Sequence, residues 1–519
     1  MMNYVKSLGT YNTRNMEKES SKDLVQNEDT PLPVQKISMS LFHEIVFVFI
    51  ACTAQLMTQA GLGQSIAPNN IIGKSLGTTN PGQLSWFPAS YSLTVGTFIL
   101  IAGRLGDIYG HKKMFVLGYI WFCIWSLISG FSYYAKSVIM FDVCRALTGI
   151  APAFLLPNAL ALLGRVYPPG KKKNLIFALF GATAPNGFLL GSVFSGIFAQ
   201  LSWWPWTYWT TAIVCIVFAI IGYFAIPHIE ADEVEEKQKF DYLGAFFGVS
   251  GLVLINFSWN QGPVVGWQVP YVYILLIIGF LSLVVFVLVE KRVVQPILAP
   301  SMMNSEMGCV LICVAAGWAC FGIWMYYLWQ FLENLRFATP LLVTAQLTPV
   351  GISGCAAALT TGYLLKRLKP TKIMVVSMIA FTVGTILIAT APIHQTYWAQ
   401  TFVSIIVTPW GMDMSFPAAT LMLSDFVPKQ HQGIAASLVS TVVNYSISIG
   451  LGIAGTVETH LNHKGVDLIR GYRSAWYMGT GFGGLGVCVA ILTVFASYLK
   501  VGQQKSPKFP LIMKNTKAV

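Results

Sequence analysis

The sequence predicts an all-α polytopic membrane protein with fourteen membrane-spanning helices. Of its 519 residues, 55% are hydrophobic and 10% are charged, and the mean hydropathy is +0.62. These values lie outside the balance of a soluble globular chain. Apolar runs of about 20 residues recur along the sequence, which is the length a helix needs to cross a hydrocarbon core about 30 Å thick.

The elements follow one another as long spans and short loops. Residues 1–40 are polar and lack the apolar core and cleavage site of a secretory signal, so we expect a disordered cytosolic tail. The acidic segment 228–240 is expected to be a cytosolic linker, and 500–519 a second cytosolic tail. The predicted spans lie near 41–60, 84–102, 114–131, 137–157, 174–200, 209–227, 241–258, 269–290, 308–332, 341–365, 371–391, 396–424, 434–456 and 474–499.

The basic residues predict the orientation of these spans. With a cytosolic N-terminus, sixteen Lys and Arg residues fall in inner loops and six in outer loops, which is the bias of cytosolic loops. Both termini are therefore expected in the cytosol. We separately expect the plasma membrane rather than the vacuolar membrane. The net charge of +12 is explained by this topology, so no nucleic-acid partner is expected. We expect a monomer in the lipid bilayer.

Metal, cofactor and catalytic chemistry are not expected. The nine cysteines all lie in apolar runs without CxxC or Cys/His ligand spacing, which predicts free thiols and no metal site. Gly73-Lys74-Ser75 ends like a phosphate-binding loop, but Pro68 stands where the first Gly of that loop belongs. No motif of a soluble catalytic domain occurs. The chain is therefore not expected to be an enzyme, and no cofactor is expected.

An internal repeat divides the chain into halves. GRLGDIYGHKK at 103–113 is echoed by GYLLKRLKPTK at 362–372, and PNALALL at 157–163 by PAATLML at 417–423. Duplicated helical bundles are a transporter architecture, with the solute path between the halves near mid-depth. We expect an N-terminal six-helix bundle and a C-terminal six-helix bundle, separated by two inserted helices with a cytosolic loop, at 41–227, 307–499 and 241–306 respectively.

The loop at 103–113 is the first candidate site. Gly103 and Gly110 allow a tight turn, and Asp107 can pair with a basic side chain or helix N-terminus of the other half. This loop, which also carries Arg104 and Lys113, resembles the G-x-L-a-D-x-x-G-r-k-x loop of the major facilitator superfamily. The resemblance implies a conformational latch that helps hold the outward-facing state. The alternative is a loop that only sets topology.

Three charged residues inside spans are candidates for proton coupling. Asp142 and Arg145 share one face of the fourth span, where each is costly unless it is paired or faces a wet cavity. A structural ion pair would meet the same need. Arg145-Ala-Leu-Thr-Gly149 resembles the R-x-x-x-G element of this family, whose arginine is associated with proton coupling in antiporters. Asp413 is the most isolated acid at membrane depth and suits a proton or cation site, or lies hydrated near the interface.

Further polar and small residues complete the candidate set. Gln55, Gln59, Gln346 and Asn444 lie inside spans and are expected either in a substrate cavity or bonded to a neighbouring helix. Gly187 and Gly191 give one helix a smooth packing face. With Pro185 they resemble the glycine-proline element of the fifth helix of antiporters, although Ala184 stands where that element usually has Gly. The first span also lacks the Asp that many related antiporters carry.

The motifs GATAPNGFLLGSVFSG and WWPWTYW are similar to the fungal fourteen-span drug:proton antiporter group of this superfamily, especially yeast aminotriazole- and boron-resistance exporters and their low-affinity ammonium-transporting relatives. The resemblance implies a major facilitator fold of two six-helix bundles plus two inserted helices. It also implies alternating access, with protons driving export of small toxic solutes such as drugs, azole-type compounds or borate. The alternatives are a low-affinity ammonium or other small-solute facilitator, and a nutrient sensor that does not transport.

Overall fold

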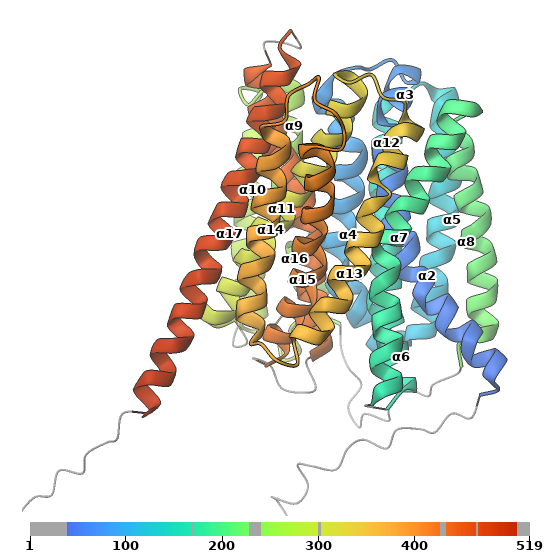
Figure 1. Ribbon diagram of the computed structural model, residues 1–519. Helices are drawn as coiled ribbons and strands as arrows, with labels where there is room; N and C mark the ends of the chain where they lie inside the picture. Colours follow the sequence, from blue (N-terminus) through green and yellow to red (C-terminus); the bar gives the residue numbers. More distant parts are fainter. Residues whose placement is uncertain are drawn as a thin grey trace, which may run out of the picture.

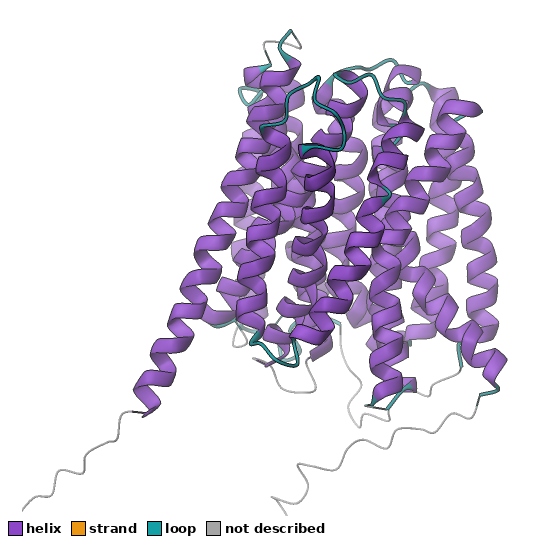
Figure 2. Cartoon of the chain, viewed as in Figure 1, coloured by secondary structure: helices purple, strands orange, loops and turns teal. Residues whose placement is uncertain are grey.

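The computed structural model describes residues 39–168, 170–227, 240–298, 303–425, 432–462 and 466–505. Figure 2 shows that the described chain consists of helices and connecting loops. Of the expected tails 1–40 and 500–519, residues 1–38 and 506–519 lie outside the described residues, as do the linker residues 228–239. The second tail was predicted to begin too early, because residues 500–505 continue the last helix.

The helices run back and forth between two faces (Figure 1). The terminal face is where α2 begins at Leu41, and the distal face is where the short helix α3 lies. The helices are α2 (Leu41–Ile66), α3 (Asn69–Ser75), α4 (Pro81–Tyr109), α5 (His111–Ala135), α6 (Val138–Val166), α7 (Lys171–Leu201), α8 (Pro205–Ala225), α9 (Tyr242–Val265), α10 (Pro270–Glu290), α11 (Ser305–Asn334), α12 (Pro340–Leu347), α13 (Pro349–Leu364), α14 (Pro370–Ala389), α15 (Gln400–Asp425), α16 (Gln432–Leu461) and α17 (Leu468–Lys505).

Thirteen candidates among the described residues are long and apolar enough to span a membrane. The helix that falls outside this set is α15, which has 26 residues but carries Asp413 and two internal prolines. Its length and its packing against α11, α13 and α14 make it the remaining expected span. The number of crossings therefore agrees with the predicted fourteen, and the least apolar of them holds the most isolated acid.

One predicted span is not a single helix. The segment 341–365 forms α12 and α13, which meet at Thr348. Pro349 starts the second piece, and a proline cannot continue the hydrogen-bond ladder of the helix before it, because it has no backbone N–H. Sequence hydropathy could not show this break, since both pieces are apolar.

The helices pack in two sets joined by a middle pair. The N-terminal set comprises α2 and α4 to α8, the C-terminal set comprises α11 to α17, and the middle pair is α9 and α10. The two sets meet mainly where α4 packs on α16 and where α7 packs on α12 and α13. Helix α9 packs on α4 and α16, whereas α10 packs chiefly on α9. Many large apolar side chains of α10 are exposed, such as Phe280, Leu281 and Val284, as expected of a surface that faces lipid.

Candidate functional site

The first seam between the two sets, α4 against α16, is close over much of its length. A Cβ atom placed on Gly96 of α4 would lie 2.6 Å from the backbone nitrogen of Tyr445. Nearer the terminal face, a Cβ atom on Gly103 would lie 3.7 Å from Ser437 Oγ. Only glycine allows the backbones to approach this closely at Gly96. This seam is therefore packed from mid-membrane toward the terminal face.

The second seam, α7 against α12 and α13, is closed only in part. A Cβ atom on Gly354 of α13 would lie 3.3 Å from Pro185 Cβ, and one on Gly196 would lie 3.2 Å from Leu341 Cδ2 near the distal face. One turn from Pro185 toward the terminal face, Gly181 is exposed, and a Cβ atom there would meet nothing within 4 Å. The seam is thus covered from mid-membrane to the distal face and uncovered toward the terminal face.

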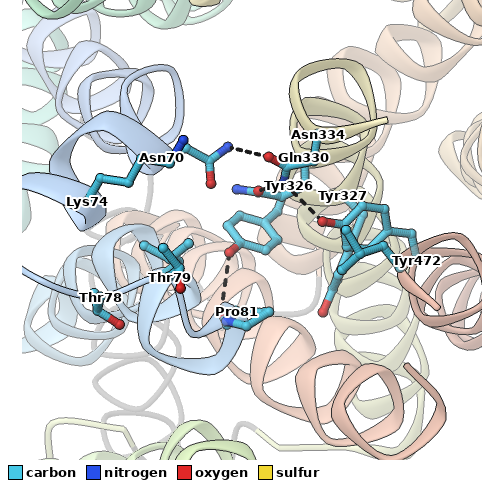
Figure 3. A pocket seen from close by; sticks show the side chains of 12 residues that line it. Asn70, Lys74, Thr78, Thr79, Pro81, Tyr326, Tyr327, Gln330, Asn334 and Tyr472 are labelled. Atoms are coloured by element: carbon cyan, nitrogen blue, oxygen red, sulfur yellow. Dashed lines mark hydrogen bonds between the residues drawn. The ribbon is translucent and has the colours of Figure 1, made fainter. Parts of the chain in front are cut away.

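A polar network closes the distal face between the two sets, and Figure 3 shows the part in which Asn70 bonds to Asn334 and Tyr326 to Pro81. Asn70 donates a hydrogen bond of 2.7 Å to Glu333 Oε2, and Gln330 donates one of 3.2 Å to Asn69. Trp329 donates 2.8 Å to the other carboxylate oxygen of Glu333. A cavity of about 160 Å³ remains inside this closure. The bonds from Asn70 and Gln330 join α3 to α11 and so hold the distal ends of the two sets together, whereas the bond of Trp329 lies within α11.

Asp413 lies at the centre of the second seam, midway along α15. Its Oδ2 atom is buried, and it has no hydrogen-bond partner among the described residues. A Cβ atom on Gly354 would lie 2.7 Å from this oxygen, so the carboxylate sits directly over the glycine that touches Pro185. Trp410, one turn away on α15, is half-buried. An unpartnered carboxylate at mid-membrane is costly unless a proton or a cation reaches it.

Arg145 and Asp142 do not form an ion pair in the described structure. The Arg145 side chain is completely buried and donates a hydrogen bond of 2.5 Å to the carbonyl oxygen of Gly61 in α2. Its guanidinium carbon also lies 4.5 Å from the ring centre of Tyr91 and 5.7 Å from that of Tyr208. Asp142 Oδ1 is buried without a hydrogen-bond partner. The arginine therefore ties α6 to α2, α4 and α8.

Two of the polar candidates, Gln55 and Gln59, share an uncovered face of α2. Ala60 packs against α7, and Thr53 bonds to Tyr119 of α5 at 2.6 Å. Thr58 accepts a bond from α4 through its backbone oxygen. Gln55 and Gln59 lie on the face of α2 that these neighbouring helices leave uncovered, and both are half-buried.

The other two polar candidates lie elsewhere. Asn444 is half-buried at mid-depth in α16 and donates 2.9 Å to Ser440 of its own helix. Gln346 lies in α12 near the distal face, and its Oε1 atom is buried without a partner. The four residues therefore do not form one cluster, because Gln346 lies well away from mid-depth.

The loop at 103–113 is a one-residue turn between α4 and α5, made at Gly110 with φ of 98°. Asp107 pairs with His111 of the same turn at 3.4 Å, and Arg104 donates 3.4 Å to Gln295. Lys113 is exposed. In this conformation the ion pair of Asp107 lies within its own half, so a latch across the halves stays a prediction for the opposite conformation.

Gly187 and Gly191 lie against the backbone of α2. A Cβ atom on either residue would collide with a carbonyl oxygen, that of Leu56 or that of Ala60. Helices α2 and α7 can approach this closely because glycine has no side chain. Pro185 lies one turn away on the face that meets Gly354, so a single helix serves packing within its set and contact between the sets.

Sequence reasoning missed several residues that the packing makes important. Asn158 is fully buried; it lies 2.8 Å from His111 Nδ1 and donates to Phe154 and Ala102, which fixes the turn at Gly110. Its place in the repeated PNALALL segment was the available signal. Glu333 was missed because it follows the predicted end of its span by one residue.

Comparison with known proteins gives a consistent result. The profile of the Major Facilitator Superfamily matches residues 48–451 and 307–514. The low affinity ammonium transporter of Saccharomyces cerevisiae is 60% identical over 474 residues, covering 90% of this chain and 92% of its own. The efflux pump terJ of Aspergillus terreus is 46% identical over 470 residues, covering 90% of each chain. The crystal structure of the peptide transporter POT in complex with sulfate matches with a TM-score of 0.66 at 13% identity, covering 91% of this chain and 98% of that one, which is a likeness of fold alone.

Proposed function

The chain belongs to the major facilitator superfamily, and we propose that it exports small toxic solutes in exchange for protons. Membership agrees with the family resemblance of the sequence motifs. It makes the chain an integral membrane transporter of small solutes rather than an enzyme. The direction of transport, the coupled ion and the solute are the parts proposed here.

The observation that carries the proposal is the position of Asp413. The carboxylate lies at mid-membrane beside the contact of Gly354 with Pro185, with one oxygen buried and unpartnered. It is therefore placed to bind a proton or a cationic solute as the second seam opens and closes. Gln55, Gln59 and Asn444 lie at similar depth in their helices and are proposed to line the solute path.

Alternating access is proposed to arise from rocking of the two helix sets as bundles, 41–227 and 307–499. The distal closure through Asn70 and Glu333, together with the uncovered second seam near Gly181, supports a state open toward the terminal face. We propose that the terminal face is cytosolic, because most of the basic loop residues lie on that side. The same bias gives no preference between membranes, and the plasma membrane is proposed from the resemblance to exporters.

The test is solute flux in vesicles that hold the purified protein. Borate, ammonium and a panel of cationic drugs are compared with and without an imposed pH gradient, for the parent and for Asp413→Asn. Gradient-driven flux of one solute in the parent, lost in Asp413→Asn, is the expected result. An Asp413→Asn protein with the same pH profile as the parent would exclude this acid as the proton site. Gradient-independent equilibration in the parent would exclude exchange with protons.

A second candidate is low-affinity transport of ammonium, and the relative of that name at 60% identity favours it. A single unpartnered carboxylate suits a small cation as well as a proton. Here Asp413→Asn abolishes ammonium flux whether or not a pH gradient is present. Competition between ammonium and protons for the same site, seen as a rise in apparent ammonium KM at low pH, distinguishes this candidate from proton-driven drug export.

A further inference from the structure

A large apolar cavity lies outside both seams, where the middle pair meets the two helix sets. Its volume is about 440 Å³, within the range of pockets that bind small molecules. Its walls come from five helices: α4, α9, α10, α11 and α16, represented by Leu100, Gly248, Phe286, Ile312 and Val442. No ion or metal chemistry fits this lining, because nearly all of it is aliphatic or aromatic.

The cavity lies at the depth of the acyl chains on the terminal side of the membrane. Its wall on α4, residues 97–101, is close to the end of that helix at Tyr109. Its wall on α9, residues 244–252, begins next to the start of that helix at the same face. At about 1.5 Å per residue, these stretches lie within roughly 20 Å of the terminal helix ends.

The cavity is continuous with the lipid-facing surface. Ile312 of α11 lines it and is 47% exposed. Helix α10 packs chiefly on α9 and not closely on α11, so the wall between α10 and α11 is incomplete. In a membrane-spanning region, the medium at that opening is the hydrocarbon of the bilayer.

We propose that this cavity binds one acyl chain of a phospholipid from the leaflet at the terminal face. An apolar cavity disfavours water, and a chain entering between α10 and α11 would fill it with matching apolar contacts. The polar residues of the lining are Thr97, Thr441, Tyr445 and Ser446, and the Oγ1 atom of Thr441 is buried without a hydrogen-bond partner among the described residues. An acyl chain leaves this hydroxyl unpaired, whereas a polar solute would bond to it, so Thr441 distinguishes the two occupants.

The bound chain would also bear on transport. Thr97 of α4 and Tyr445 of α16 both line the cavity, on opposite sides of the first seam. Rocking of one set against the other would change the shape of the cavity, so a chain that fits it stabilises the present conformation. This consequence rests on the alternating access proposed above, whereas the binding itself does not.

The experiment uses the full chain in nanodiscs that contain a phosphatidylcholine with a photoreactive diazirine in its acyl chain. Cross-linked peptides are identified by mass spectrometry for the parent and for Ala315→Phe, which fills the cavity from α11. The matched control is Val284→Phe, which places the same side chain on the lipid-facing side of α10, where Val284 is 57% exposed. Ala245→Leu fills the cavity from α9 and serves if Ala315→Phe does not fold.

In the parent, labels are expected on peptides of α9, α11 and α16 that line the cavity. The larger side chains take the space of the acyl chain, and a packed site does not accommodate both. Labelling there should therefore fall about tenfold in Ala315→Phe and Ala245→Leu, and stay unchanged in Val284→Phe. Equal labelling in the filling variants and the control would overturn the site. Thr441→Val should leave labelling unchanged or raise it, because the hydroxyl makes no bond to an acyl chain. Absence of labels from the cavity peptides of the parent would overturn an acyl chain as the occupant. Labelling does not depend on flux, so failure of the proposed transport leaves it unaffected.

Discussion

Helices α6 and α15 hold equivalent places in the internal repeat, yet each buries a charge that the other lacks. Pro157 of α6 corresponds to Pro417 of α15. Twelve residues before each proline, Arg145 of α6 corresponds to Ile405 of α15. Four residues before each proline, Asp413 of α15 corresponds to an alanine of α6. The two halves therefore share an equivalent helix, but the buried charged residue lies at a different position in each.

The difference lies in how the two charges are satisfied. Arg145 has a backbone carbonyl and two tyrosine rings around it, although its Nε atom is buried without a hydrogen-bond partner among the described residues, as is Asp413 Oδ2, which has no such neighbours. A buried charge with built-in partners holds helices together. A buried charge without them requires something that arrives from outside, such as a proton or a cation. From this comparison we propose a structural role for Arg145 and a transport role for Asp413.

The largest expected effect is a loss of protein stability, which should occur on substitution of Arg145 but not of Asp413. Arg145→Gln removes a charge-assisted hydrogen bond and the contacts with Tyr91, and should destabilise the protein by about 2–3 kcal/mol. Asp413→Asn keeps the size of the side chain and removes an unpartnered charge, so its thermal unfolding in detergent should match the parent. Equal losses of stability in the two variants would contradict the comparison.

The next effect tests the surroundings of Asp413. Gly354→Ala places a methyl group 2.7 Å from Asp413 Oδ2, closer than two such atoms can lie, so the carboxylate must move. If that displacement costs about 1.4 kcal/mol, transport falls about tenfold. Gly362→Ala is the matched control on the same helix, since a Cβ atom there meets nothing within 4 Å. Unchanged flux in Gly354→Ala would argue against a strict position for the carboxylate.

A smaller effect is expected at the turn between α4 and α5. Asp107→Asn weakens the ion pair with His111 and removes the charge proposed to latch the opposite conformation. Transport should fall while the amount of protein in the membrane stays the same, as measured by flux and by membrane immunoblot. Lys171→Gln, at an exposed position outside this loop on the same face, is the control. Unchanged transport in both directions for Asp107→Asn would remove the latch.

The smallest effect is expected for Asp142→Asn. Asp142 resembles Asp413 in having a buried oxygen without a partner, but it lies three residues from the charge of Arg145, near the distal end of α6. That neighbouring charge offsets its own, so neither stability nor the pH dependence of flux should change much. A loss of pH dependence in Asp142→Asn that exceeds the loss in Asp413→Asn would move the proton site from α15 to α6.

Much of the fold was within reach of the sequence. Span number followed from the length of the apolar runs, and repeats such as Pro157 and Pro417 predicted a division into halves. The candidate acids were also visible, because charged residues are rare inside spans. The break of the tenth span at Thr348 was not visible, because a proline at a helix start and a proline inside a helix look alike in an apolar run.

The sequence by itself determined that this chain is helical and membrane-spanning, since hydropathy and span length are local properties of consecutive residues. Only the tertiary structure decided which buried charges are satisfied. Partners such as Gly61 for Arg145, or Glu333 for Asn70, come from distant segments, and their approach depends on how each helix is rotated and packed. For the same reason the isolation of Asp413 over Gly354 emerged only when α7, α13 and α15 were placed together.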